Sequence, residues 1–190
     1  MVVREVRPDD PAVVPIIAIH VATMSDGNTP SDACQRPDLA GLLEPTITFF
    51  GAYPKAIDHT INHSVHHTID HPVDHPVHHI VDETLHASSG ASIAPDGPAG
   101  IGAFAHRAAD WGEVKSMHVL EPRDRSISRA LLEAIEGEDR ARGVGTLRLE
   151  TARHFTAAIS LYERSGFAEC GAFGDYNDHP ASLFMEKRLS

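Results

Sequence analysis

A tetrapeptide repeat between Asp58 and Leu85 is the feature that most restricts what this chain can fold into. It reads DHTI, NHSV, HHTI, DHPV, DHPV, HHIV and DETL, and an aliphatic residue closes every unit. Pro72 and Pro76 each cost roughly 3 kcal/mol in a helix interior, and the β-branched closing residues also oppose a helix. In a strand, the histidines and the aliphatic residues would share one face, which is a poor amphipathic pattern. We therefore expect 54–96 to form one long, mobile surface loop of low complexity.

The repeat is also rich in side chains that bind metal ions. Nine of the chain's 14 histidines lie between residues 59 and 86, interleaved with aspartates. Neutral imidazoles near carboxylates bind zinc, nickel or copper, so a metal-binding module is one interpretation. The other is a repeat expansion in a solvated loop, where metal binding is incidental; we favour it and assign no metal site. The weak candidates for metal ligands are His59, His63, His67, His71, His75 and His79.

The chain before the repeat has the patterns of strand, helix and strand. Residues 12–24 carry apolar side chains at near-helical spacing, which predicts a helix. Residues 46–53, TITFFGAY, are rich in β-branched and aromatic side chains, which predicts a strand. A short strand is expected at 2–6, and a poorly defined helical stretch is expected to run to Leu43.

The chain after the repeat alternates between strand and helix patterns. Residues 126–142 have apolar side chains at helical spacing, and Gly143 is expected to end that helix. The order strand, helix, strand, helix, strand implies an α/β layer with parallel pairing at its centre. The expected strands are 100–106, 113–120, 146–150, 167–172 and 182–188, and the expected helices are 126–142 and 156–165.

Composition favours one folded domain over disorder, a membrane protein or a nucleic-acid binder. With 190 residues, 42% of them hydrophobic, the chain can bury one core, so we expect a single domain over 1–190. Its formal net charge of −11 opposes binding to phosphate backbones and to anionic membranes. Cys34 and Cys170 show no metal-type spacing, and neither a long apolar run nor a secretory signal is found. These features predict a cytoplasmic protein with reduced thiols.

Three segments give the chain a family resemblance. GEVKSMHV followed by RDRSISRALLEAI resembles the fourth strand, pyrophosphate loop and third helix of the GNAT N-acetyltransferase superfamily. AAISLYERSGF resembles its fourth helix, and FGDYNDHPASLFMEKRL resembles the closing strands of a mostly uncharacterised bacterial branch. The resemblance implies an α/β fold with a mixed twisted sheet of about six to seven strands and about four helices. The histidine-rich loop would then be inserted between the second and third strands.

The same resemblance implies acetyl-CoA as the acyl donor, but the pyrophosphate loop departs from the family pattern. Ser126 and Ser128 stand at the two glycine positions of Arg/Gln-x-x-Gly-x-Gly/Ala, and Asp124 takes another place often held by glycine. Serine side chains can crowd the backbone approach to a phosphate, and a carboxylate repels it. Serine hydroxyls and nearby arginines still donate hydrogen bonds, so we expect weakened rather than abolished binding. Phe155 replaces an asparagine of the family's fourth helix. The implied donor-binding residues are Met117, His118, Val119, Arg123, Asp124, Arg125, Ser126, Ile127, Ser128, Arg129, Phe155 and Ala158.

The resemblance also implies two catalytic residues. Tyr162 stands where the family's general acid protonates the departing thiolate; the alternative is a buried aromatic side chain. Glu113 is the candidate general base, acting through water, although it can equally be an exposed strand carboxylate. His118 is a further candidate base, because imidazole titrates near neutrality, but it can also pack or cap. Lys115 and Tyr176 are weaker candidates for lining the acceptor side of the site.

The function implied is acetyl transfer from acetyl-CoA to a primary amine of a small molecule. A homodimer is compatible with this, because dimers are common in the superfamily. Two other classes stay open: a non-catalytic domain that binds CoA or a partner, and a metal-binding module built on the histidine tract. The altered loop and Phe155 motivate the first of these, and the repeat motivates the second.

Overall fold

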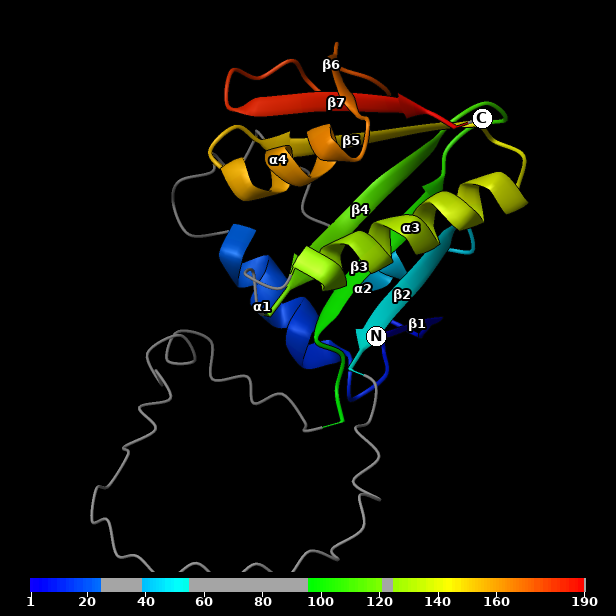
Figure 1. Cartoon of the computed structure of the whole chain (residues 1–190), viewed down its shortest axis with the longest axis vertical. Helices are drawn as coiled ribbons and strands as arrows, with labels where there is room; N and C mark the ends of the chain where they lie inside the picture. The colour runs from blue at the N-terminus through cyan, green and yellow to red at the C-terminus, as the bar shows by residue number, and fades with distance from the viewer. Residues whose placement is uncertain (25–38, 55–95, 121–124, 190) are drawn as a thin grey trace, which may run out of the picture.

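The computed structural model describes residues 1–24, 39–54, 96–120 and 125–189 (Figure 1). These residues form one mixed sheet in the order β1-β2-β3-β4-β5-β7-β6, together with four helices. The strands are β1 (Val2–Glu5), β2 (Ile47–Tyr53), β3 (Gly100–His106), β4 (Gly112–Val119), β5 (Thr146–Ala152), β6 (Ala168–Cys170) and β7 (Ser182–Arg188). The helices are α1 (Val14–Met24), α2 (Leu39–Leu42), α3 (Arg125–Ala141) and α4 (Thr156–Arg164).

The predicted α/β class, strand number and helix number are confirmed for this described part of the chain. Two elements are shorter than expected. The helical stretch that ends near Leu43 is a single turn, α2, and the strand expected at 167–172 is only β6. β6 pairs with β7 at three positions, and Phe173 is buried shortly after its end. The histidine repeat, with its weak metal candidates, follows β2 in sequence and lies outside the described residues.

The parallel pairing expected at the centre of the sheet joins β4 to β5, and it is short. The paired positions are Gly112 with Leu147 and Glu113 with Arg148. β4 stays paired with β3 as far as Val119, whereas β5 is covered on its other side by β7. Figure 1 shows β4 and β5 separating beyond their paired ends. The sheet is therefore open at its centre.

Helices cover both faces of the sheet because successive strand residues point to opposite sides. In β2, Phe50 packs in a cluster with residues of α3, and its neighbour Phe49 packs in a second cluster with residues of α1. Figure 1 shows α3 crossing one face, with α1 on the other side. The α3 contribution is a stripe at helical spacing, formed by Ile127, Leu131 and Ile135. The opening between β4 and β5 therefore lies between the sheet face covered by α3 and the sheet face covered by α1.

A glycine at the start of β4 is required by the close approach of a buried ring. A methyl group at Gly112 would contact Cε2 of Phe104 and lie 2.7 Å from its Cζ, and Phe104 is fully buried. We expect Gly112→Ala to lower the free energy of unfolding by about 2 kcal/mol, because overpacking a rigid core is destabilising. Gly137→Ala is the matched control: it lies in α3 with open space around it, and alanine there should stabilise by about 0.5–1 kcal/mol. Urea unfolding of both variants is the measurement, and equal stabilities would contradict the packing argument.

Candidate active site

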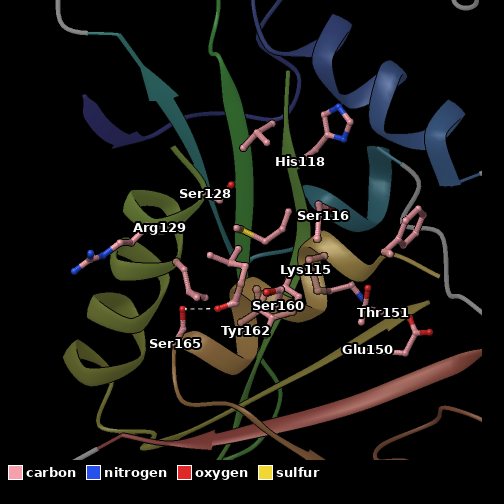
Figure 2. A pocket seen from close by; sticks show the side chains of 18 of the residues that line it. Lys115, Ser116, His118, Ser128, Arg129, Glu150, Thr151, Ser160, Tyr162 and Ser165 are labelled. Atoms are coloured by element: carbon pink, nitrogen blue, oxygen red, sulfur yellow. Dashed lines mark hydrogen bonds between the residues drawn. The ribbon is translucent and has the colours of Figure 1, made fainter. Parts of the chain in front are cut away.

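A cavity of about 1270 Å³ lies where β4 and β5 separate. Its wall is built from α1, β4, α3, β5 and α4, with Tyr176 from the β6–β7 segment and Lys187 from β7. Figure 2 shows side chains from these elements pointing into the space between the strands. The volume exceeds the roughly 300–1,000 Å³ of ordinary small-molecule pockets, so the cavity suits a long ligand or two ligands.

Most of the donor-binding and catalytic residues expected from the sequence lie on this cavity. Ser126 is exposed in the first turn of α3 and Ile127 is buried in the core, and neither lines it. Arg123 and Asp124 lie outside the described residues. The predicted residues that do line it are Glu113, Met117, His118, Val119, Arg125, Ser128, Arg129, Phe155, Ala158 and Tyr162.

The backbone of β4 is irregular beside the cavity. Ser116 has a φ of 52°, and the β3–β4 register shifts between Ile101 and Ala103 as in a β-bulge. The Ser116 hydroxyl oxygen is buried, and within the described part of the chain it has no hydrogen-bond partner. Because β5 no longer pairs with this part of β4, the β4 backbone groups on the edge that faces the cavity are also available to a ligand. The sequence did not point to Ser116, because a single serine within a predicted strand does not by itself indicate a functional site.

Glu113 is the centre of a buried charged cluster. It is 1% exposed, which excludes the alternative of a surface carboxylate. Arg107 Nε donates to its Oε2 at 2.7 Å, and Lys115 Nζ donates to its Oε1 at 3.3 Å. The Tyr176 hydroxyl also donates to Oε1. The carboxylate therefore accepts hydrogen bonds from two cations and a phenol.

Tyr176 was expected from the sequence only as a residue lining the acceptor side, and it does line the cavity. Its hydroxyl accepts from Lys115 Nζ at 3.2 Å while it donates to Glu113. Burial and the Glu113 charge raise the pKa of Tyr176 far above its usual value, so the phenol keeps its proton. Phe173 holds this segment against the sheet, with its ring 5.3 Å from those of Trp111 and Tyr176. The interaction spans 63 residues of sequence, which explains why local patterns did not reveal it.

Tyr162 brings a second phenol to the cavity from α4. It is 6% exposed and packs edge-to-face on Phe167, with ring centroids 5.7 Å apart. Burial raises the pKa of the Tyr162 hydroxyl above its ordinary value, so it too stays protonated at neutral pH. The residue is thus buried in the core and also lines the cavity, which is compatible with both roles considered for it.

Two buried histidines meet where α1 packs on β4. The rings of His20 and His118 are 5.4 Å apart, and both side chains line the cavity. Burial, together with His118, lowers the pKa of His20 to about 4, and burial also lowers the pKa of His118. Both imidazoles are therefore neutral at pH 7, where each has the form that can accept a proton.

The histidine pair predicts a loss of stability in mild acid. Above the unfolded pKa of about 6.5, His20 is neutral in both states and contributes nothing. As pH falls towards 4, the unfolded chain binds a proton that the folded chain refuses, so the free energy of unfolding decreases. We expect His20→Leu to reduce the loss between about pH 8 and pH 5 by about 2 kcal/mol. Urea unfolding at both pH values is the measurement. The exposed His154→Gln is the control, and an unchanged pH dependence in His20→Leu would contradict the burial argument.

Comparison with known proteins places these features in context. The model of the Acetyltransferase (GNAT) family matches residues 57–167. An IAA acetyltransferase from Azospirillum brasilense is 50% identical over 80 residues, covering 42% of this chain and 52% of that protein. The chain therefore spans about half the length of this curated relative.

Solved structures resemble the whole described fold. A suggested acyl-CoA N-acyltransferase from Klebsiella pneumoniae subsp. pneumoniae MGH 78578 is 24% identical, with a TM-score of 0.66 and coverage of 100% of this chain and 97% of that chain. An aminoglycoside 6'-N-acetyltransferase complexed with coenzyme A is 12% identical, with a TM-score of 0.58 and coverage of 99% and 97%. These likenesses concern the fold alone. Among the described residues, no helix is long and apolar enough to cross a membrane.

Proposed function

Because the chain belongs to the GNAT acetyltransferase family, we propose that it transfers an acetyl group from acetyl-CoA to a primary amine of a small molecule. The observation that carries this proposal is the cavity at the separation of β4 and β5, which holds Glu113 and Tyr162 in one space. A carboxylate and a protonated phenol are the two groups that acetyl transfer needs, because one proton must leave the amine and another must reach the thiolate.

The acyl donor fits the chemistry of the cavity wall. The N-terminal turn of α3 presents backbone N–H groups without helical partners, and Arg125, Ser128 and Arg129 line the cavity beside it. These groups would hold the pyrophosphate of acetyl-CoA. The buried Ser116 hydroxyl and the unpaired edge of β4 would hydrogen-bond the pantetheine arm and polarise the thioester carbonyl. The relative solved with coenzyme A supports this assignment through its shared fold.

In the proposed chemical step, β4 and Tyr162 act on the acyl donor, and Glu113 acts on the acceptor amine. The amine attacks the thioester carbonyl, and the negative charge that develops on oxygen is stabilised by β4 N–H groups. The tetrahedral intermediate collapses by breaking the C–S bond, and Tyr162 donates its proton to the sulfur that leaves. We assign the proton that the amine releases to Glu113, a buried carboxylate of β4 beside the cavity. We expect a small-molecule amine because the acceptor side is a cavity lined by α1, β4 and Tyr176 of the β6–β7 segment.

Thermal unfolding and turnover test this proposal together. Acetyl-CoA at a hundred times its dissociation constant should stabilise the fold by about 2.7 kcal/mol, whereas ATP at the same concentration should not. Release of free thiol should then depend on an added amine from a panel of amino-acid amides, polyamines and Nα-acetyl-lysine amide. Stabilisation without release would favour a non-catalytic CoA-binding domain. No stabilisation and no release with any amine would exclude the proposed function.

A further inference from the structure

We propose that Tyr176 is a catalytic residue that takes the proton from the acceptor amine and relays it to Glu113. This inference rests on the proposed acetyl transfer and goes beyond it by assigning the route of the amine proton. It makes Glu113 the final acceptor rather than the group that touches the amine. The argument depends on the contacts of four side chains: Arg107, Glu113, Lys115 and Tyr176.

Glu113 is poorly placed to meet a substrate itself. Its side chain is 2% exposed, so little of the carboxylate reaches the cavity. Arg107 occupies Oε2, while Lys115 and the Tyr176 hydroxyl occupy Oε1. An incoming amine would have to displace a charged partner to touch the carboxylate. A proton can reach Glu113 without such displacement only through a group already bonded to it.

Tyr176 is both hydrogen-bonded to Glu113 and accessible from the cavity. It is half-buried, lines the cavity, and donates its hydroxyl proton to Glu113 Oε1. Its phenolic oxygen has two lone pairs, and Lys115 Nζ uses one of them at 3.2 Å. The second lone pair is available to accept a proton from an amine in the cavity. Because burial and the charge of Glu113 raise its pKa, the phenol always has a proton to pass on.

Lys115 cannot replace Tyr176 in this step. As an ammonium it has three donors and no acceptor, so it cannot take a proton from the substrate. It instead donates hydrogen bonds to the phenolic oxygen of Tyr176 and to Oε1 of Glu113, which holds the two groups together. Phe173, packed between Trp111 and Tyr176, fixes the ring in this position.

The proton balance of the step is simple. The substrate ammonium first passes one proton to Tyr176 Oη while the Tyr176 proton moves to Glu113 Oε1, which frees the nitrogen lone pair. The neutral amine then attacks the acetyl carbon. Its second N–H proton passes to solvent as the amide forms, and Tyr162 regains from solvent the proton that it gives to the sulfur. Tyr176 ends as a neutral phenol, and Glu113 ends protonated and later returns its proton to solvent by the same route. The thiolate receives its proton from Tyr162, so the two protons travel on separate paths.

The test is the pH dependence of kcat/KM in Tyr176→Phe. At about pH 7, where an ε-amino group of pKa about 10.4 is protonated, we expect Tyr176→Phe to lower kcat/KM for Nα-acetyl-lysine amide about 100-fold. The loss should shrink towards a few-fold as the pH approaches the pKa of the amine, because fewer protons then need to be removed. For glycinamide, with an α-amino pKa of about 8, the loss should shrink at a correspondingly lower pH. A structural defect would instead lower the rate by one factor at every pH.

A double variant and two control variants complete the experiment. If the two residues share one path, Glu113→Gln combined with Tyr176→Phe should cost no more than the larger single change. Tyr53→Phe, which removes a hydroxyl from β2 outside the cavity, should match the wild type. If the wild type is active and Tyr176→Phe is equally active, or loses activity by the same factor at every pH, the relay is overturned but the proposed acetyl transfer is not. The relay is also overturned if His118→Gln, rather than Tyr176→Phe, gives the pH-dependent loss of kcat/KM. Absence of turnover in the wild type overturns the relay and the proposed function together.

Discussion

Tyr162→Phe should lower kcat about 100-fold and leave the KM for acetyl-CoA within about threefold, because general acid catalysis contributes roughly this much. The substitution keeps the ring that packs on Phe167 and removes only the hydroxyl. Burial keeps that hydroxyl protonated, so it is a proton donor at all pH values where the protein is folded. Without it, the thiolate must leave as an anion in a poorly solvated cavity, which raises the barrier of the C–S cleavage.

Steady-state kinetics of thiol release, with acetyl-CoA varied at saturating amine, measures this effect. Thermal unfolding of the variant separates catalysis from folding, since Tyr162 also belongs to the core. Tyr53→Phe is again the control for loss of a hydroxyl outside the cavity. An unchanged kcat in Tyr162→Phe, with or without a small loss of stability, would mean that the tyrosine is only a buried aromatic residue.

The fold was largely predictable because its elements are encoded locally. The apolar stripe of α3 repeats with the period of a helix, and β2 is rich in the β-branched and aromatic residues that favour strands. The order of elements then implied parallel pairing, which β4 and β5 provide. The ends of elements were less predictable. β6 stops at Cys170, and beyond it Phe173 packs its ring against Phe184 of β7, a contact that no local pattern indicated.

The site was only partly predictable because its decisive contacts join distant segments. Glu113 and Tyr162 were found by their place in motifs. Tyr176 was expected only to line the acceptor side, and Arg107 was not expected at all. Both reach Glu113 through the β3–β4 hairpin and the β6–β7 segment, and no local pattern reveals those contacts. Ser116 is similar, since its positive φ arises from the register shift against β3.

The serines of the altered loop illustrate a further limit. The family pattern suggested that glycine was needed at both positions, yet Ser126 and Ser128 lie in the first turn of α3. Among the described non-glycine residues, a positive φ is found at Ser116 and not at these two. The backbone there does not require the conformational freedom of glycine, so any effect on donor binding must come from side-chain bulk and hydrogen bonding. Ser128, which is half-buried on the cavity, is the position where such an effect should be felt. Weakened binding of acetyl-CoA stays a prediction.

Glu113→Ala should destabilise the fold by about 3 kcal/mol, because it removes one partner of a buried ion pair and leaves the other unpaired. Lys115 is only 9% exposed, so its ammonium cannot regain the hydration that the carboxylate replaces. Tyr176 also loses the acceptor of its hydroxyl proton. Arg107 is 31% exposed and can turn to water, so it contributes less to the loss. Urea unfolding at neutral pH measures the change.

The compensated variant distinguishes an unpaired charge from a simple cavity. Glu113→Leu combined with Lys115→Met replaces both charges by apolar groups of similar size, and it should recover most of the stability lost in Glu113→Ala. Glu133→Ala, which breaks an exposed pair with Arg129, should change stability by less than about 0.5 kcal/mol. If Glu113→Ala behaves like Glu133→Ala, the buried cluster is not the source of stability argued above. If the double variant is as unstable as Glu113→Ala, lost packing rather than the unpaired Lys115 charge is the cause. Recovery in the double variant, without recovery of turnover, is the outcome expected for a cluster that serves catalysis at a cost in stability.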